Sequence, residues 1–140
     1  MRTAVVCLVG LMLLSGCGDS AQTPTAPSST IPFTIVDLTV GTGVQPVVGG
    51  QLTVNYTGWL YDASGTDNKG SQFDTGQGFV FTLGVGNVIA GWDQGFAGMQ
   101  VGGTRRLIIP PELAYGSQGA GGVIPPNATL VFDIDLVSVP

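Results

Sequence analysis

The feature that most constrains the fold is one short stretch with helical spacing in a chain otherwise patterned as strands. In the segment 88–97, Val88, Trp92 and Phe96 lie four residues apart and share one face of a helix. A helix this short is marginal alone, because few hydrogen bonds follow its costly nucleation. Strands elsewhere must therefore supply the packing that holds it. The simplest interpretation of Trp92 taken alone is core filling, since large apolar side chains dominate protein interiors.

Five segments alternate apolar and polar residues with the period of a strand that buries one face: 34–40, 52–57, 79–83, 104–109 and 130–137. In the last, Asp133 and Asp135 oppose four apolar side chains, so a slip of one residue would bury both aspartates. Glycine-rich turns separate the segments, and such close spacing favours antiparallel pairing. The predicted fold class is α+β, a curved antiparallel sheet of about five strands wrapped around the short helix.

The first residues have the pattern of an export signal. Arg2 supplies the positive charge, and the apolar run 3–14 is shorter than the roughly 20 residues that span a bilayer. The ending Leu-Ser-Gly-Cys17 resembles the lipobox of bacterial lipoproteins, in which the signal is cut before a cysteine that carries the lipid. The alternative is a plain secretory signal followed by an incidental cysteine. Cys17 is thus the predicted lipidation site.

This processing defines three parts of the chain. Residues 1–16 are the predicted signal peptide, and 17–32 are the lipidated cysteine and a flexible linker, too polar and proline-rich to offset the entropy of ordering it. Residues 33–140 are long enough for one domain with one core. We therefore expect an exported lipoprotein anchored to a membrane of a bacterial cell envelope only through the Cys17 lipid.

The residue inventory excludes several classes of function. The chain has no histidine, which rules out histidine triads and histidine metal sites, and the mature chain would keep only the acylated cysteine, leaving no disulfide. After residue 17, three basic residues stand against nine acidic ones, a formal charge of three minus nine, or −6. Such a chain repels a phosphate backbone, so nucleic acid is not an expected partner. No metal and no cofactor are predicted.

Aromatic side chains from separate segments are expected to gather beside Trp92 under the sheet. One core would explain some of them, but it does not easily explain tyrosines or Asp74 next to Phe73. Buried hydroxyls and carboxylates need partners, whereas the mouth of a pocket offers them water and ligand. The aromatic residues concerned are Tyr56, Phe73, Phe79, Phe81, Tyr115 and Phe132.

The chain from residue 50 to 137 closely resembles the FKBP-type peptidyl-prolyl isomerases. Any one of the matching motifs is weak alone, and their order and spacing together carry the resemblance. The motifs are Val54-Asn55-Tyr56-Thr57-Gly58, Phe73-Asp74, Val88-Ile89-Ala90-Gly91-Trp92, Ala114-Tyr115-Gly116, Ile124-Pro125-Pro126-Asn127-Ala128-Thr129-Leu130 and Phe132-Asp133.

This resemblance implies a proline pocket with Trp92 as its floor and polar edges from Asp74 and two tyrosine hydroxyls. The backbone N–H of Ile89, at the start of the helix, would face a substrate carbonyl. The implied catalytic residues are Tyr56, Asp74, Ile89, Trp92, Tyr115 and Phe132. The implied substrate-binding residues are Phe73, Phe79, Phe81, Val88, Val123 and Ile124, the last two forming a flap.

Three departures from the family pattern affect the details. The loop 75–78 lacks the basic residue that many members place against the motif aspartate, so Tyr56 is the expected partner of Asp74. Ala120 stands where relatives often carry histidine or an aromatic residue, which predicts a more open flap. The segment 61–72 is longer than in minimal members and is expected to be a mobile surface loop.

The leading hypothesis is a prolyl isomerase that speeds the folding of exported or envelope proteins. Its implied partners are proline-containing polypeptides and macrolides of the FK506 or rapamycin type, and the chain is expected to be a monomer. One rival is a binding module or chaperone that grips proline segments without turnover. Another is a structural envelope domain with a vestigial pocket.

Overall fold

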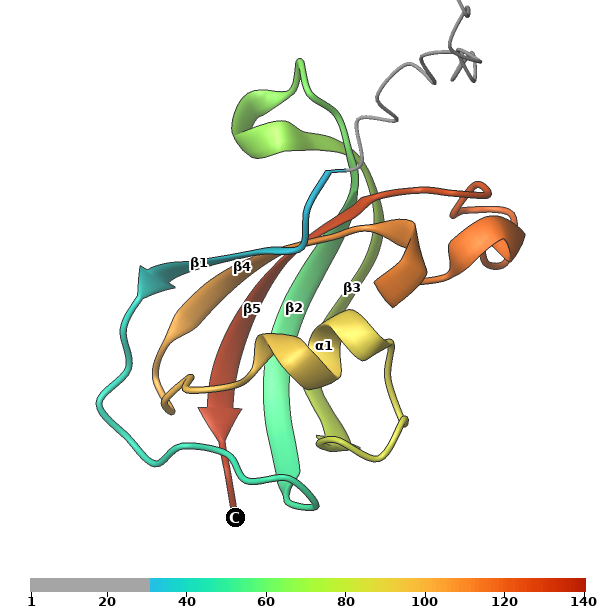
Figure 1. Cartoon of the computed structure of the whole chain (residues 1–140). Helices are drawn as coiled ribbons and strands as arrows, with labels where there is room; N and C mark the ends of the chain where they lie inside the picture. The colour runs from blue at the N-terminus through green and yellow to red at the C-terminus, as the bar shows by residue number, and fades with distance from the viewer. Residues whose placement is uncertain (1–30) are drawn as a thin grey trace, which may run out of the picture.

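The computed structural model describes residues 31–140; the predicted signal peptide, Cys17 and most of the predicted linker lie outside them. In this part of the chain no helix is long and apolar enough to cross a bilayer. The elements in order (Figure 1) are β1 (Thr34–Thr39), β2 (Gln51–Tyr61), η1 (Thr66–Asn68), β3 (Lys69–Thr82), α1 (Ala90–Gly95), β4 (Thr104–Ile109), η2 (Pro111–Leu113), η3 (Gly116–Gln118) and β5 (Leu130–Ser138).

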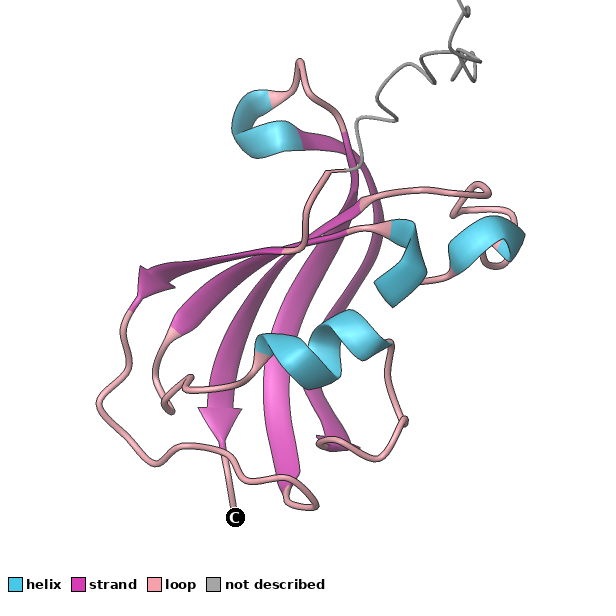
Figure 2. Cartoon of the chain, viewed as in Figure 1, coloured by secondary structure: helices cyan, strands magenta, loops and turns pink. Residues whose placement is uncertain are grey.

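The five strands form one antiparallel sheet in the order β1-β4-β5-β2-β3. The sheet twists and curves, and α1 lies across its concave side (Figure 2). This arrangement confirms the predicted α+β fold class. The core between helix and sheet is formed by Leu52, Val54, Phe81, Leu83, Trp92, Phe96, Met99, Leu107, Ile109, Ile124, Leu130, Phe132, Ile134 and Leu136.

The register of β5 follows its apolar alternation. Its four inward side chains are buried, while Asp133 and Asp135 lie on the outer face, as the pattern predicts. Val131 departs from the pattern, because it is also buried although it points outward. Its neighbours across the two adjoining strands are Trp59 and Ile108, which supply apolar surface on that side of the sheet.

The helix α1 is shorter than predicted and rests on β4 through two residues without side chains. Gly91 and Gly95 lie four apart, on one face of the helix. A Cβ added at Gly91 would stand 2.5 Å from Ile109 Cγ2, and one at Gly95 would stand 2.4 Å from Leu107 Cδ1. The helix therefore approaches β4 more closely than any other residue would permit. Val88, predicted as helical, belongs to the loop before α1.

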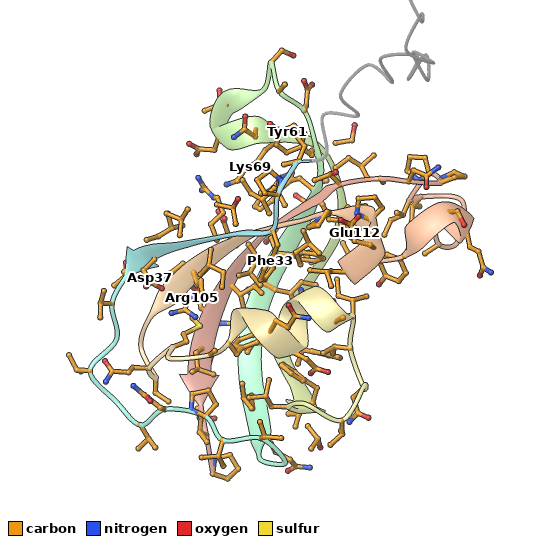
Figure 3. The ribbon with its side chains drawn as sticks, in the orientation of Figure 1. Phe33, Asp37, Tyr61, Lys69, Arg105 and Glu112 are labelled. Carbon is orange, nitrogen blue, oxygen red and sulfur yellow. The ribbon has the colours of Figure 1, made fainter. Side chains whose placement is uncertain are left out.

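A buried arginine on β4 holds the far end of this helix. The Nη1 atom of Arg105 donates to Gly95 O at 2.8 Å and to Ala97 O at 2.7 Å, and its Nε atom donates to Asp37 Oδ1 at 2.6 Å. Cationic donors satisfy the free carbonyls at a helix C-terminus and complement its dipole. Arg105 thus connects α1, β4 and β1, and Figure 3 shows Asp37 and Arg105 together at that edge.

The predicted surface loop 61–72 is wrong in its second half. β3 begins at Lys69, so only residues 62–68 lie between the strands. They close a turn in which the Asp62 carboxylate accepts the hydroxyl and the amide of Ser64. As an edge strand, the start of β3 is specified by pairing with β2 and not by apolar alternation, which explains why the sequence pattern missed it.

Lys69 also joins an ion cluster on the outer face of the sheet. Its Nζ atom lies 2.6 Å from Asp133 Oδ2, and Arg106 Nε lies 2.7 Å from Asp133 Oδ1. Burial alone would raise the pKa of Asp133, but the hydrogen bonds from Arg106 and Lys69 outweigh it and hold that pKa below its ordinary value. The cluster ties the start of β3 to β4 and β5.

The close contact between Gly91 and Ile109 predicts that adding one methyl group to Gly91 lowers the free energy of unfolding. Replacing Gly91 by Ala gains about 1 kcal/mol of helix propensity but overpacks a fully buried site, and a contact as short as 2.5 Å puts that cost in the upper part of the usual range, at about 2–3 kcal/mol. We expect Gly91→Ala to lower the free energy of unfolding in urea by about 1–2 kcal/mol. The matched control, Gln94→Ala, is exposed on the same helix and should change it by less than about 0.5 kcal/mol. An unchanged or raised stability of Gly91→Ala would show that the contact is not tight.

Candidate active site

One apolar pocket opens where the concave side of the sheet meets the start of α1. Its volume is about 300 Å³, within the range of small-ligand sites. Strands β2, β3 and β5, the loop before α1, the helix itself and the segment between η2 and η3 all contribute to it. The lining residues are Tyr56, Phe73, Asp74, Phe79, Asn87, Val88, Ile89, Trp92, Tyr115 and Phe132.

The indole of Trp92 forms the floor and is enclosed by the edges of other rings. Its centroid lies 5.0 Å from that of Tyr56 and 5.3 Å from that of Phe132, with planes at 80° and 84°. Such edge-to-face pairs are favourable beyond the area they bury. Trp92 Nε1 is buried without a hydrogen-bond partner among the described residues. The floor of the pocket is thus an aromatic surface packed by other rings, and its polar atom, Trp92 Nε1, has no partner among the described residues.

A hydrogen-bonded pair supplies the polar edge. The Tyr56 hydroxyl donates to Asp74 Oδ2 at 2.8 Å, and the Thr75 amide donates to Asp74 Oδ1 at 2.8 Å. Within residues 31–140 no lysine or arginine forms an ion pair with Asp74. A hydroxyl and an amide therefore hold this carboxylate where a cation could have done so.

Both pocket tyrosines keep their protons at neutral pH. Burial, followed by the hydrogen bond to Asp74 and its charge, raises the pKa of Tyr56 to about 12. Burial, and then the charge of Asp74, also raises the pKa of Tyr115 above its ordinary value. The Tyr115 hydroxyl at the pocket mouth is therefore available as a donor.

The loop that leads into α1 is fixed by a carboxylate of the helix. Asp93 Oδ1 accepts the amide of Gly84 at 2.9 Å, and Asp93 Oδ2 accepts the amide of Gly86 at 3.2 Å. Both glycines have positive φ, near +79° and +77°, which this turn requires. Ile89 follows as the N-cap residue, and the first amide bonded within the helix is that of Trp92, to Ile89 O. The amide of Ile89 therefore precedes the hydrogen-bonded part of the helix, next to the pocket.

Comparisons with known proteins agree on one family. A family model described as FKBP-type peptidyl-prolyl cis-trans isomerase matches residues 43–137. The chain is 52% identical over 105 residues to an FK506-binding protein of Neisseria meningitidis serogroup A, covering 75% of this chain and 94% of the relative. It is 47% identical over 106 residues to FK506-binding protein 1 of Dictyostelium discoideum, covering 74% and 96%.

A solved structure shows the same likeness. The peptidyl-prolyl cis-trans isomerase of Pseudomonas syringae pv. tomato superimposes with a TM-score of 0.66 at 39% identity, covering 76% of this chain and 74% of the other. The chain belongs to the FKBP family. It is a peptidyl-prolyl cis-trans isomerase of the FKBP type.

The FKBP pocket gathers nine of the twelve residues predicted as catalytic or substrate-binding, and the other three lie elsewhere. Phe81 is buried behind the wall, stacked on Phe79 at 5.9 Å and packed against Trp92 at 5.5 Å. In the flap, Ile124 points into the core and is buried, whereas Val123 is exposed outside the lining. Strand alternation places Phe79 and Phe81 on one side but does not tell which of them reaches the cavity.

Sequence reasoning missed one residue of the FKBP pocket and two that support it. Asn87 lines the pocket, and its only signal is its position next to the Val88-Ile89 motif. Asp93 and Arg105 act on the two ends of α1, through contacts that no sequence pattern reports. In residues 31–140 no group of three or more Asp, Glu, Cys or His is placed to hold a metal ion.

The raised pKa of Tyr56 predicts a late step in alkaline titration. Because the folded-state pKa of about 12 exceeds the ordinary 10.0, the associated stability is fully present below pH 10.0 and is lost as the pH rises through about 12. The free energy of unfolding should thus stay level up to about pH 10, fall between about pH 10 and 12, where only the unfolded chain loses this proton, and level off above that range. Phenolate absorbance should show one tyrosine ionising last, and Tyr56→Phe should remove that step. Tyr61→Phe, outside the pocket, should retain it; a late step that survives in Tyr56→Phe contradicts the assignment.

Proposed function

We propose that this isomerase accelerates X-Pro rotation in exported or envelope proteins, by non-covalent catalysis in its aromatic pocket. The observation that carries the proposal is the pocket itself, a cavity of about 300 Å³ lined mainly by aromatic and aliphatic side chains, with Asp74 and Asn87 as its polar lining residues besides the tyrosines. A proline ring on the Trp92 floor leaves the amide bond to be rotated beside the Tyr56–Asp74 pair. The family establishes the reaction, and the pocket geometry supports this way of performing it.

The chemistry needs no nucleophile, because rotating an X-Pro bond makes and breaks no covalent bond. The barrier of about 18–20 kcal/mol comes from lost amide resonance. A twisted amide has a less polar carbonyl than a planar one. An apolar cavity therefore penalises the planar ground state more than the twisted transition state, which lowers the barrier.

Two donors at the pocket edge hold the twisted substrate in this proposal. The amide of Ile89 donates a hydrogen bond to the carbonyl before the proline, and the protonated Tyr115 hydroxyl donates to a second substrate oxygen. Holding both oxygens selects a conformation already rotated toward the transition state. Asp74 acts through Tyr56, whose ring forms part of the wall.

The proposed location rests on the sequence before the described domain. The predicted export signal, the lipobox-like ending and the polar linker support Cys17 as a lipid anchor in a bacterial envelope. Clients would then be chains that have just crossed the membrane. The aromatic side chains of the pocket wall also suit unfolded segments, whose apolar residues are exposed.

Macrolides of the FK506 type are the second proposed ligand class. Two relatives are named FK506-binding proteins and share about half of their residues with this chain. We expect such a macrolide to compete with proline peptides for the same pocket. The rival function is a binding module that grips proline segments without turnover. A coupled assay of cis-trans rotation on a short X-Pro peptide separates the two, since only the isomerase raises the rate above the uncatalysed one.

The solvation mechanism predicts that the wall matters more than the acid. Phe132→Ala opens the pocket to water and should abolish most turnover, whereas Asp74→Asn keeps the wall and should reduce turnover only modestly. Truncating a buried Phe costs about 3–5 kcal/mol of stability, so rates count only for variants that circular dichroism shows to be folded. Phe132→Leu is a milder truncation, and its turnover is a second measurement of how far the wall contributes.

The same assay gives a pH criterion. With no histidine in the chain, turnover should be nearly flat between about pH 6 and 8. A bell-shaped profile there, or a folded Asp74→Asn variant less active than a folded Phe132→Ala variant, would indicate charge-assisted catalysis instead.

The anchoring proposal predicts a change of compartment. Cys17→Ser removes the lipidation site, so the protein should leave the membrane fraction while its X-Pro activity per molecule is retained. One acyl chain gives only marginal binding, so the intact anchor needs more than one. Fractionation of cells expressing each form measures the effect. A serine variant that stays quantitatively in the membrane pellet would show that Cys17 is not the anchor.

A further inference from the structure

Strongly exposed valines lie on two neighbouring connections at one end of the domain. Val47 and Val48, in the connection from β1 to β2, are 65% and 77% exposed, and Val85, between β3 and α1, is 56% exposed. Single exposed apolar residues are ordinary on protein surfaces. These three, which we call the valine strip, differ because they are close together and lie beside the pocket. Both connections run along the lower end of the sheet in Figure 1.

Specific contacts bring the two connections side by side. A Cβ added to Gly84 would stand 2.8 Å from Val48 Cγ1, so the valine side chain lies directly on the turn that carries Val85. The amide of Gly49 donates to Leu83 O at 2.8 Å, and the amide of Leu83 donates to Gly50 O at 2.9 Å. The strip is thus a continuous surface made from two segments.

The strip also adjoins the pocket along the chain. Val85 is followed after one glycine by Asn87 and Val88, which line the cavity. The hydrogen bonds from Gly84 and Gly86 to Asp93 fix this turn on the helix. The distance from Val88 to Val85 is at most about 10 Å, which an extended chain covers with about three residues.

No charge interrupts this surface. The segments 38–61 and 75–92 contain no Asp, Glu, Lys or Arg. Asp93, the carboxylate that contacts the turn carrying Val85, has both oxygens engaged by backbone amides. Apolar surface of this kind marks a site of interaction. A bilayer is the less fitting occupant, because no basic residue in either segment could attract anionic head groups.

We propose that the valine strip is a second docking surface for the client, which binds apolar residues flanking the proline held in the pocket. This inference rests on the proposed function, since its occupant is the same polypeptide. The preferred clients are then unfolded chains with an apolar segment a few residues from an X-Pro bond. Docking there adds binding energy remote from the rotating bond and raises kcat/KM on long substrates.

The test compares the full chain on two peptides of about 15 residues that share one central proline. One carries leucine and valine in its flanks, and the other carries serine at those positions; an X-Pro tetrapeptide reports the pocket alone. We expect kcat/KM to be about fivefold higher on the apolar-flanked peptide than on the serine-flanked one. In V47T/V48T this ratio should fall to near one. Because the ratio is taken within one protein, any effect on the pocket itself cancels.

The matched control is V36T/V40T, with exposed valines on and after β1, at the opposite edge of the sheet. It should keep the full ratio. A parent ratio near one, or a ratio equally high in V47T/V48T, overturns the proposal that the valine strip binds the client. If the tetrapeptide is still turned over in that case, the proposed function is unaffected. Absence of tetrapeptide turnover overturns the proposed function, and this inference with it.

Co-sedimentation with phosphatidylglycerol vesicles should be the same for parent and V47T/V48T. A loss of co-sedimentation in the variant would show that the strip binds the bilayer and would overturn the proposal.

Discussion

The contact between α1 and β4 is the constraint on which the rest of the structure depends. A helix of six residues cannot be stable by itself, so it must be held by what surrounds it. Gly91 and Gly95 bring its backbone against Leu107 and Ile109, where any side chain would collide. Arg105 then satisfies the carbonyls at its far end. The glycines, weak helix formers elsewhere, are therefore the residues that let this helix exist here.

Fixing the helix in this way also creates the pocket. With one face on β4, α1 presents Trp92 toward β2 and β5, and the aromatic rings around the indole close on it edge-first. The near end of the helix stays open, because the loop before it is held by Asp93 and does not fold over it. One short element thus supplies the floor of the pocket, the free amide of Ile89 at its rim and the turn that carries Val85.

The features that the sequence predicts correctly are those with a periodic pattern or a recognisable motif. Alternation located four strands closely, and the order of short motifs identified most of the pocket. Contacts between distant segments leave no such pattern. Lys69 starts a strand because it pairs with β2 and bonds Asp133. In the sequence Arg105 is an ordinary strand residue, and only the folded chain shows that it binds the end of the helix. The family resemblance implies Phe81 and Ile124 as pocket residues, but both are buried in the core, because depth is set by tertiary packing and not by motif order or periodicity.

The pocket is best understood as a part of the core that is left unfilled. Trp92 and Phe132 are each only 4% exposed, yet both line the cavity, so the same rings serve as core and as wall. Gly58 shows how closely this wall is fitted, since a Cβ there would stand 2.7 Å from the rings of both Phe73 and Phe132. A side chain at that position would collide with both rings and disturb the pocket wall. The residues that stabilise the core are therefore the same residues that shape the pocket.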